Sequence, residues 1–171
     1  GVSVNYLSNA GLAKLAKSWI VYEDDNVIFF NKPEGILSQK AVQSDISMVE
    51  YLLAYLTDTG FLNTEESRGF QPGICNRLDR NTSGLITAGK SLAGLQIMSE
   101  LFKDRTLKKY YLCIVRGKIE KSKHIKGFLR KDEKTNKVEI LTRSTGKDVM
   151  PIETEYLPIA WNEEMTLLKV H

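Results

Sequence analysis

The sequence predicts an α+β fold with a mainly antiparallel mixed sheet and flanking helices. Two amphipathic helical segments lie early in the chain, and the strands after them follow one another through short polar turns. This order favours antiparallel neighbours over a doubly wound fold, in which strands and helices alternate. With 171 residues, 42% of them hydrophobic, the chain can bury one sizeable core, so a single domain is the default interpretation.

The first predicted elements are a hairpin and a helix. WIVYEDDNVIFFNKPEGIL contains two short β segments around an acidic turn and ends in a bend at Pro33 and Gly35. In SDISMVEYLLAYLTDTG, apolar residues recur at helical spacing and Gly60 closes the segment. The second pattern predicts an amphipathic helix, whose candidate N-caps are Ser44, Asp45 and Ser47.

A second helix and further strands account for most of the remaining chain. In SLAGLQIMSELFKDR an apolar stripe has helical spacing, and we expect it to pack into the core: Leu92, Leu95, Met98, Leu101 and Phe102. Strands are predicted from β-branched and aromatic content in KKYYLCIVRGKI, KVEILTR, PIETEYLPIAW and EMTLLKV.

The net charge of +3 conceals an uneven distribution of charge. Residues 103–137 contain 13 Lys and Arg against 4 Asp and Glu, a net charge of +9, so the rest of the chain carries −6. Such a block is either a solvated loop or strand face, or a surface for a polyanion with Tyr110, Tyr111 and Phe128 as stacking rings. Both interpretations stay open on the sequence alone.

Several classes of site lack their sequence signatures. Cys75 and Cys113 lie far apart without a nearby His cluster, which argues against a zinc site or a disulfide framework. Walker, Rossmann and Gly-x-Ser-x-Gly motifs do not occur, so we expect no metal and no cofactor. No apolar stretch approaches the roughly 20 residues of a membrane helix, and no signal peptide is visible, so we expect a cytoplasmic protein without membrane contact.

One carboxylate stands between two arginines in ICNRLDRNTSGLITAGKS. Asp79 lies between Arg77 and Arg80, ahead of a polar turn at residues 81–84. Such residues beside a turn are commonly solvated caps or weak surface pairs. Two guanidinium groups, however, favour the ionised form of an acid between them and can bind phosphate. The sequence therefore leaves two interpretations, a surface turn or a nucleophilic Asp at a strand–loop junction.

Three motifs in order resemble those of the RluA-type RNA pseudouridine synthases. NRLDRNTSG matches that family's central His-Arg-Leu-Asp-Arg-x-Thr-Ser-Gly motif, with Asn76 where His is usual. NKPEG matches an upstream Asn-Lys-Pro-x-Gly motif, and KYYLCIVRG matches a downstream Lys-x-Tyr followed by Gly. The resemblance implies a pseudouridine synthase-like catalytic domain over residues 21–171. Residues 1–20 are then expected to be a linker or the end of an upstream segment, such as an S4 domain.

The resemblance also implies roles for individual residues. Asp79 corresponds to the catalytic nucleophile, and Tyr111 to the aromatic residue that stacks on the uracil and assists proton transfer. Arg77 corresponds to the residue that enters the RNA as the target base leaves its stack. The other candidate substrate-binding residues are Arg80, Lys109 and Lys32.

The implied reaction converts uridine to pseudouridine by breaking the N1–C1′ bond, turning the uracil and joining C5 to the same sugar carbon. An ionised Asp can add to the sugar, add to the base or assist formation of a glycal, and the residues do not choose among these routes. The target base must first leave its stack, which costs a few kcal/mol and is least costly in unpaired RNA.

The leading hypothesis is a monomeric RNA-modifying isomerase that acts on large-subunit ribosomal RNA, with transfer RNA as the alternative substrate. A non-catalytic RNA-binding module on the same fold is the competing class. A third hypothesis, an unrelated α+β hydrolase that uses Asp79, has little support because the base and oxyanion partners that such chemistry needs are lacking. The family's last motif, Gly-Arg-x-His-Gln-Ile-Arg-x-His, does not occur up to His171. We therefore expect an incomplete catalytic domain that lacks its C-terminal part, including an arginine that pairs with Asp79, and that has little activity by itself.

Overall fold

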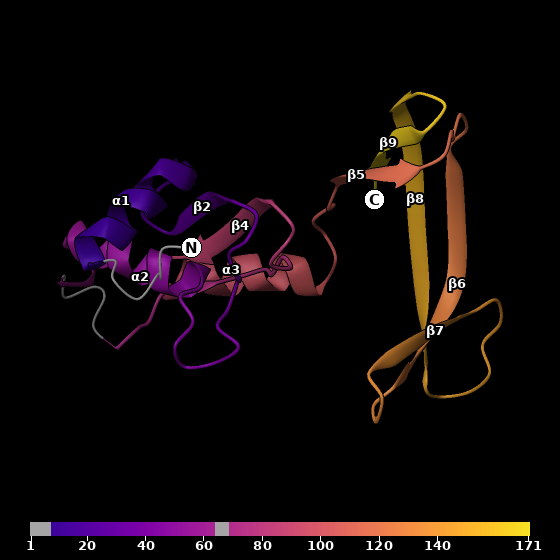
Figure 1. The fold of residues 1–171 in the computed structure, drawn as a ribbon. Coiled ribbons are helices and arrows are strands. Elements are labelled where there is room, and N and C mark those ends of the chain that lie inside the picture. Colours follow the sequence, from indigo (N-terminus) through magenta and orange to yellow (C-terminus); the bar gives the residue numbers. More distant parts are fainter. Residues whose placement is uncertain (1–7, 64–68) are drawn as a thin grey trace. The chain divides into compact units, whose positions relative to one another are not determined.

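The computed structural model describes residues 8–63 and 69–171, and the chain forms two compact units, residues 1–107 and 108–171. Among the described residues, the N-terminal unit combines three α-helices with a four-stranded sheet, and the C-terminal unit is a five-stranded sheet (Figure 1). Every strand pair in both sheets is antiparallel. The predicted α+β class is confirmed. The length of the chain by itself favours one domain, but the structure has two compact units.

The N-terminal sheet has the order β1-β2-β4-β3. Its strands are β1 (Ile20–Glu23), β2 (Val27–Lys32), β3 (Gly73–Ile74) and β4 (Gly84–Gly89). The predicted hairpin is confirmed by the pairing of β1 with β2. Asp24 closes its turn, because one carboxylate oxygen accepts from the backbone N–H groups of Asn26 and Val27, both at 2.8 Å.

Helix α2 (Met48–Asp58) confirms the first predicted helix. Of the three candidate caps, Ser47 is the N-cap, and Glu50 Oε1 accepts from its N–H at 3.1 Å and its hydroxyl at 2.9 Å. Gly60 follows the helix with a φ of +76°, a conformation that glycine adopts without strain. A short 3₁₀ turn, η2 (Phe61–Asn63), comes directly after it.

Helix α1 (Asn9–Trp19) occupies a segment for which the sequence predicts only a linker or the end of an upstream segment. Ser8 caps it, since its hydroxyl oxygen accepts from the N–H of Gly11 at 3.1 Å. Ala13 and Ala16 are buried, and the Trp19 ring meets the Tyr51 ring of α2 edge-on at 4.8 Å. Small side chains allow the two helices to approach closely, but they give a weak apolar pattern in the sequence. Residues 9–19 are therefore part of the N-terminal unit, while the boundary near residue 21 stays a prediction.

The core of the N-terminal unit lies between these two helices and the sheet. Along β2 the side chains alternate, so that Ile28 and Phe30 are fully buried while their neighbours are less so. They pack with residues of both helices and of β4: Ala16, Met48, Tyr51, Leu52, Leu56 and Ala88. The same alternation directs the next residue on this face, Lys32, into the interior.

Helix α3 (Leu92–Lys103) confirms the second predicted helix but not the prediction that its apolar stripe is core. Leu92 is 56% exposed, the other four residues of the stripe are only partly buried, and Gly94 is the one buried residue of the helix. A Cβ at Gly94 would lie 2.1 Å from the carbonyl oxygen of Asn26, and one at Gly89 would lie 2.5 Å from the Leu95 backbone. The helix backbone thus contacts the hairpin turn and β4 directly, and its larger side chains remain at the rim.

The C-terminal sheet has the order β5-β9-β8-β6-β7. Its strands are β5 (Tyr111–Arg116), β6 (Lys123–Asp132), β7 (Lys137–Leu141), β8 (Val149–Trp161) and β9 (Met165–Val170). Four of them confirm the predicted strands. Strand β6, which lies beside the long strand β8 (Figure 1), has no counterpart among the predicted ones because it falls in the basic block, where lysines conceal the alternating pattern.

We predict that Gly94→Ala lowers the free energy of unfolding by about 1–3 kcal/mol, because the added methyl group would overlap the Asn26 carbonyl. Helix propensity acts in the opposite direction, by about 1 kcal/mol in favour of alanine. Urea denaturation of the variant measures the balance. Gln96→Ala, at an exposed position of the same helix, is the control and should change stability by less than about 0.5 kcal/mol. A more stable Gly94→Ala variant would contradict the close packing of α3.

A second prediction concerns Tyr55, whose hydroxyl donates to Glu23 Oε2 at 2.7 Å and so joins α2 to β1. Burial, with the hydrogen bond and negative charge of Glu23, raises the pKa of Tyr55 from 10.0 to about 12. Between these values the unfolded chain loses this proton first, so stability falls as pH rises from about 10 to 12. Tyr55→Phe should lose less stability over this pH range than the wild type in parallel urea titrations; equal slopes would contradict the assignment.

Candidate active site

The loop that carries Asp79 runs from the end of β3 to the start of β4 and is held by the segment after β2. The Leu78 N–H donates to Ser38 Oγ at 2.8 Å, and the Ser38 hydroxyl donates to the Leu78 carbonyl at 2.6 Å. The Gly35 N–H donates to the Arg80 carbonyl at 2.8 Å. These bonds fix the backbone on both sides of Asp79. The NKPEG and NRLDRNTSG motifs, far apart in the sequence, therefore lie against each other.

Lys32 joins the same two segments from inside the protein. Its side chain is completely buried, and its ammonium donates to the carbonyl oxygens of Ile36 at 2.7 Å, Pro33 at 3.1 Å and Arg80 at 3.3 Å. An ammonium has three donors, so these three acceptors satisfy it completely. The resemblance implies that Lys32 binds substrate; in the structure its charged group lies beneath the loop and supports it.

The charge of Lys32 also acts on the site. Burial lowers the pKa of the Lys32 ammonium, while the negative charges of Asp79 and Glu34 act to raise it. The Lys32 ammonium and the Asp79 carboxylate thus interact electrostatically.

Asn76, the departure from the family motif, closes the base of the loop onto β4. Its amide nitrogen donates to the Leu85 carbonyl at 3.0 Å, and its Oδ1 accepts from the N–H and hydroxyl of Thr87 at 2.7 and 3.0 Å. This role was not predicted from the sequence. The one sequence feature that could have indicated this role is a polar amide directly after a strand. Asn and Asp side chains commonly form hydrogen bonds to nearby backbone groups.

Asp79 and its two neighbouring arginines are exposed at the top of this support. The Thr82 N–H donates to the Asp79 carbonyl at 3.0 Å and forms the turn that follows. Within the described ranges neither Arg77 nor Arg80 forms an ion pair with Asp79. The pKa of Asp45 is lowered by the N–H groups of Val42 and Ala41, and also by the charge of Arg80. Arg80 therefore interacts with the segment at residues 41–45.

The remaining predicted residues belong to the C-terminal unit. Lys109 is exposed and lies just before β5. Tyr111 is the first residue of β5, is 39% exposed and pairs with Val170 of β9. The N-terminal unit thus brings together Asp79, Arg77, Arg80 and Lys32, whereas Lys109 and Tyr111 belong to the C-terminal unit.

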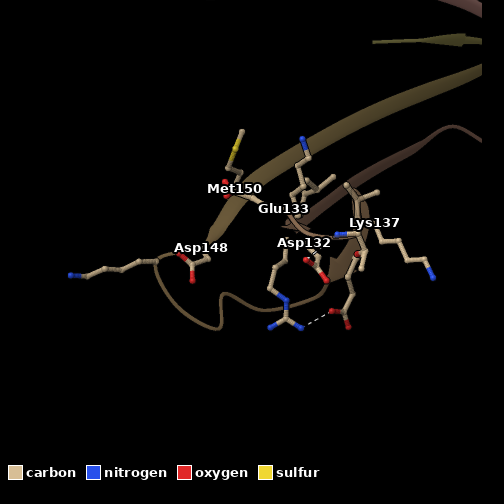
Figure 2. Close-up of a pocket in the computed structure, with 12 residues that line it drawn as sticks. Asp132, Glu133, Lys137, Asp148 and Met150 are labelled. Carbon is tan, nitrogen blue, oxygen red and sulfur yellow. Dashed lines mark hydrogen bonds and ion pairs between the residues drawn. The ribbon is translucent and has the colours of Figure 1, made fainter.

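A pocket of about 1180 Å³ lies in the C-terminal unit, around the hairpin of β6 and β7 and the start of β8 (Figure 2). Both acidic and basic side chains line it, among them Asp132, Lys137 and Asp148, and Arg130 forms an ion pair with Glu139. It contains none of the residues predicted to act on RNA. Across residues 8–63 and 69–171, no three His, Cys, Asp or Glu side chains are grouped to hold a metal ion. None of the helices described is long and apolar enough to cross a membrane.

We predict that Lys32→Met destabilises the protein by roughly 2 kcal/mol or more, because three partly buried carbonyl groups lose their hydrogen bond from the ammonium and the Arg80 carbonyl keeps only that from the Gly35 N–H among the bonds described. Methionine keeps much of the apolar stem but supplies neither donors nor charge. Lys40→Met, the same change at an exposed position of the same unit, should have little effect. Urea denaturation of the two variants makes the comparison, and equal stability in both would show that the Lys32 bonds do not hold the loop.

Comparison with known proteins places these motifs in a family. The RNA pseudouridylate synthase family model matches residues 26–169. Ribosomal large subunit pseudouridine synthase D of Borreliella burgdorferi is 34% identical over 139 residues, which cover 80% of this chain and 41% of that protein. Ribosomal large subunit pseudouridine synthase C of Vibrio parahaemolyticus is 28% identical over 151 residues, which cover 88% of this chain and 43% of that protein.

Solved structures agree at the level of the fold. Human RNA Pseudouridylate Synthase Domain Containing 4 superposes with a TM-score of 0.73 at 18% identity, covering 96% of this chain and 62% of that one. The chain spans less than half the length of the two curated relatives described above. The match extends through both units and includes all three motifs. The chain belongs to the RNA pseudouridylate synthase family, and its motifs and relatives place it with the RluA-type members.

Proposed function

We propose that the protein is an RNA pseudouridine synthase that acts on large-subunit ribosomal RNA, with Asp79 as its nucleophile. The observation that carries the proposal is the position of Asp79: an exposed carboxylate on a loop that a buried lysine and the NKPEG segment hold from below. The choice of ribosomal RNA is supported by the names of the curated relatives, which are ribosomal large subunit pseudouridine synthases.

In the proposed reaction the Asp79 carboxylate acts on the ribose of an extruded uridine. It either bonds to C1′ as the N1–C1′ bond breaks, or removes the proton from C2′ to leave a glycal; in both routes the bonding electrons remain on N1 of the uracil. The uracil then turns and C5 forms the new bond to C1′; in the first route the Asp79–C1′ bond breaks at this step, and in the second Asp79 returns the proton to C2′. The proton of C5 is then lost and N1 gains one. Substrate and product are isomers, so the net reaction consumes no co-reactant.

The geometry suits this chemistry because the backbone on either side of Asp79 is fixed. Ser38 holds Leu78 and Gly35 holds Arg80, so the carboxylate projects from a loop that has little freedom to move. Holding a reacting group in position before the substrate binds lowers the entropic part of the barrier. The buried Lys32 ammonium also interacts electrostatically with the carboxylate from inside the protein.

Exposed side chains near Asp79 and on β5 are assigned to RNA binding. We propose that Arg77, next to Asp79 in the loop, enters the RNA stack when the target uridine leaves it, and that Tyr111 stacks on the uracil. Arg80 and Lys109 are exposed cations that can meet phosphate groups. Stacking by Tyr111 needs an open ring face, and its exposed fraction of 39% is consistent with one.

We predict that Asp79→Asn lowers the rate of pseudouridine formation by at least about 1000-fold while RNA binding persists, because asparagine keeps the shape but loses the charge and nucleophilicity. Chemical labelling of pseudouridine in unmodified large-subunit ribosomal RNA measures the first quantity, and a gel shift measures the second. Asp25→Asn, the same change at an exposed residue of the hairpin turn, is the control and should retain activity.

Two results would contradict the proposal. Undiminished pseudouridine formation by Asp79→Asn would remove Asp79 as the nucleophile. RNA binding by the complete wild-type protein without any pseudouridine formation would instead identify a non-catalytic RNA-binding module on this fold.

A further inference from the structure

The register of the C-terminal sheet places Tyr111 in a row of side chains that crosses four strands. Tyr111 of β5 pairs with Val170 of β9, which pairs with Tyr156 of β8, which pairs with Lys123 of β6. Directly paired residues of neighbouring strands point to the same face of a sheet. The four side chains therefore lie on one face, which we call the Tyr111 face.

The acidic residues in the strands of the C-terminal sheet all lie on the face opposite the Tyr111 face. Glu155 pairs with His124, Glu153 with Lys126, Glu139 with Arg130 and Asp132 with Lys137, and each of these positions alternates with residues of the Tyr111 face. In the five strands of this sheet, all of which the structure describes, Lys123 and Lys131 are the charged residues on the Tyr111 face. This face is therefore positive and free of strand carboxylates.

Ion pairs neutralise much of the basic block on the opposite face. Glu153 contacts both His124 and Lys126, the latter at 3.8 Å, and Arg130 contacts Glu139 at 2.5 Å. Lys123, by contrast, is exposed and forms no ion pair with the acidic residues that the structure describes. A phosphate group that approaches Lys123 meets an uncompensated charge, whereas one that approaches Lys126 or Arg130 must compete with a glutamate.

We infer that the RNA next to the target uridine lies across the Tyr111 face, where Tyr156 stacks on a neighbouring base and Lys123 meets a backbone phosphate. This inference rests on the proposed function, because it takes Tyr111 as the residue that stacks on the target uracil. Strands lie about 4.8 Å apart, so Tyr156 is roughly 10 Å from Tyr111 and Lys123 one strand farther.

The chemistry of the row is that of a site for single-stranded nucleic acid. Such sites combine aromatic rings, on which bases stack, with cations that follow the backbone. Tyr156 is only partly buried, so part of its ring is accessible, and the paired strands on both sides hold it in place. Lys123 has a long flexible stem that can reach a phosphate beside the stacked base.

The test compares Lys123→Gln with Lys126→Gln in the complete protein. The two lysines lie on the same exposed strand and lose the same charge, but they point to opposite faces. Binding to a fluorescent single-stranded oligouridine is measured at several salt concentrations, in the Asp79→Asn background so that the RNA is not modified. Lys123→Gln should lower affinity and reduce the slope of log affinity against log salt by about 0.7, while Lys126→Gln should leave the slope unchanged.

Tyr156→Leu tests the stacking contact in the same assay. We expect about a tenfold loss of affinity with an unchanged salt slope, because stacking does not release counterions, and Tyr156→Phe should bind as well as tyrosine. Circular dichroism verifies that both variants fold. If Tyr156→Leu does not fold, the two lysine variants decide the question by themselves, since both positions are exposed.

The outcomes separate this inference from the proposed function. Equal slopes for the two lysine variants, or a larger change for Lys126→Gln, would overturn the assignment of RNA to the Tyr111 face even if Asp79 is essential. A reduced slope for Lys123→Gln alone would support the RNA surface even if Asp79→Asn retained activity and the proposed nucleophile were wrong.

Discussion

The candidate active site depends on one buried cation. Lys32 lies at the end of β2, and its ammonium bonds three carbonyl oxygens, two from the segment after β2 and one from the loop that carries Asp79. Without this donor the Pro33 and Ile36 carbonyls would each lose a partly buried hydrogen bond, which is costly, while the Arg80 carbonyl would keep its bond from the Gly35 N–H. Ser38 and Gly35, which follow β2 like the segment that Lys32 bonds, form hydrogen bonds to the same loop. The two motifs thus form one hydrogen-bonded support beneath Asp79.

The second organising constraint is the period of two along the strands of the C-terminal unit. A net charge of +9 in residues 103–137 describes a basic block but not which face of the sheet each basic side chain occupies. Alternation in β6 sends Lys123 to one face and Lys126 to the other, and pairing with β8 brings Glu153 to the face of Lys126. Acidic residues outside the block, in β7 and β8, therefore decide which of its cations remain available to a polyanion.

Helices, strands and motifs that depend on residues close together in the chain could be predicted from the sequence. The helices over residues 48–58 and 92–103, the hairpin and four strands of the second sheet followed from apolar periodicity and turn residues. Local patterns do not reveal three further features, which packing partners decide. Helix α1 packs through alanines, α3 approaches the sheet through glycine and leaves Leu92 exposed, and Lys32 is buried although lysine is typical of surfaces.

The sequence by itself determined the family, the antiparallel α+β class and the identity of the candidate nucleophile, because each follows from residues that are close together along the chain. Only the tertiary structure decided what surrounds those residues. Three features depend on contacts that form only in the folded chain: the bond of Lys32 to the Arg80 carbonyl, the bonds of Asn76 to β4, and the ion pairs that neutralise part of the basic block. Such contacts are set by strand register and burial, which no local pattern specifies.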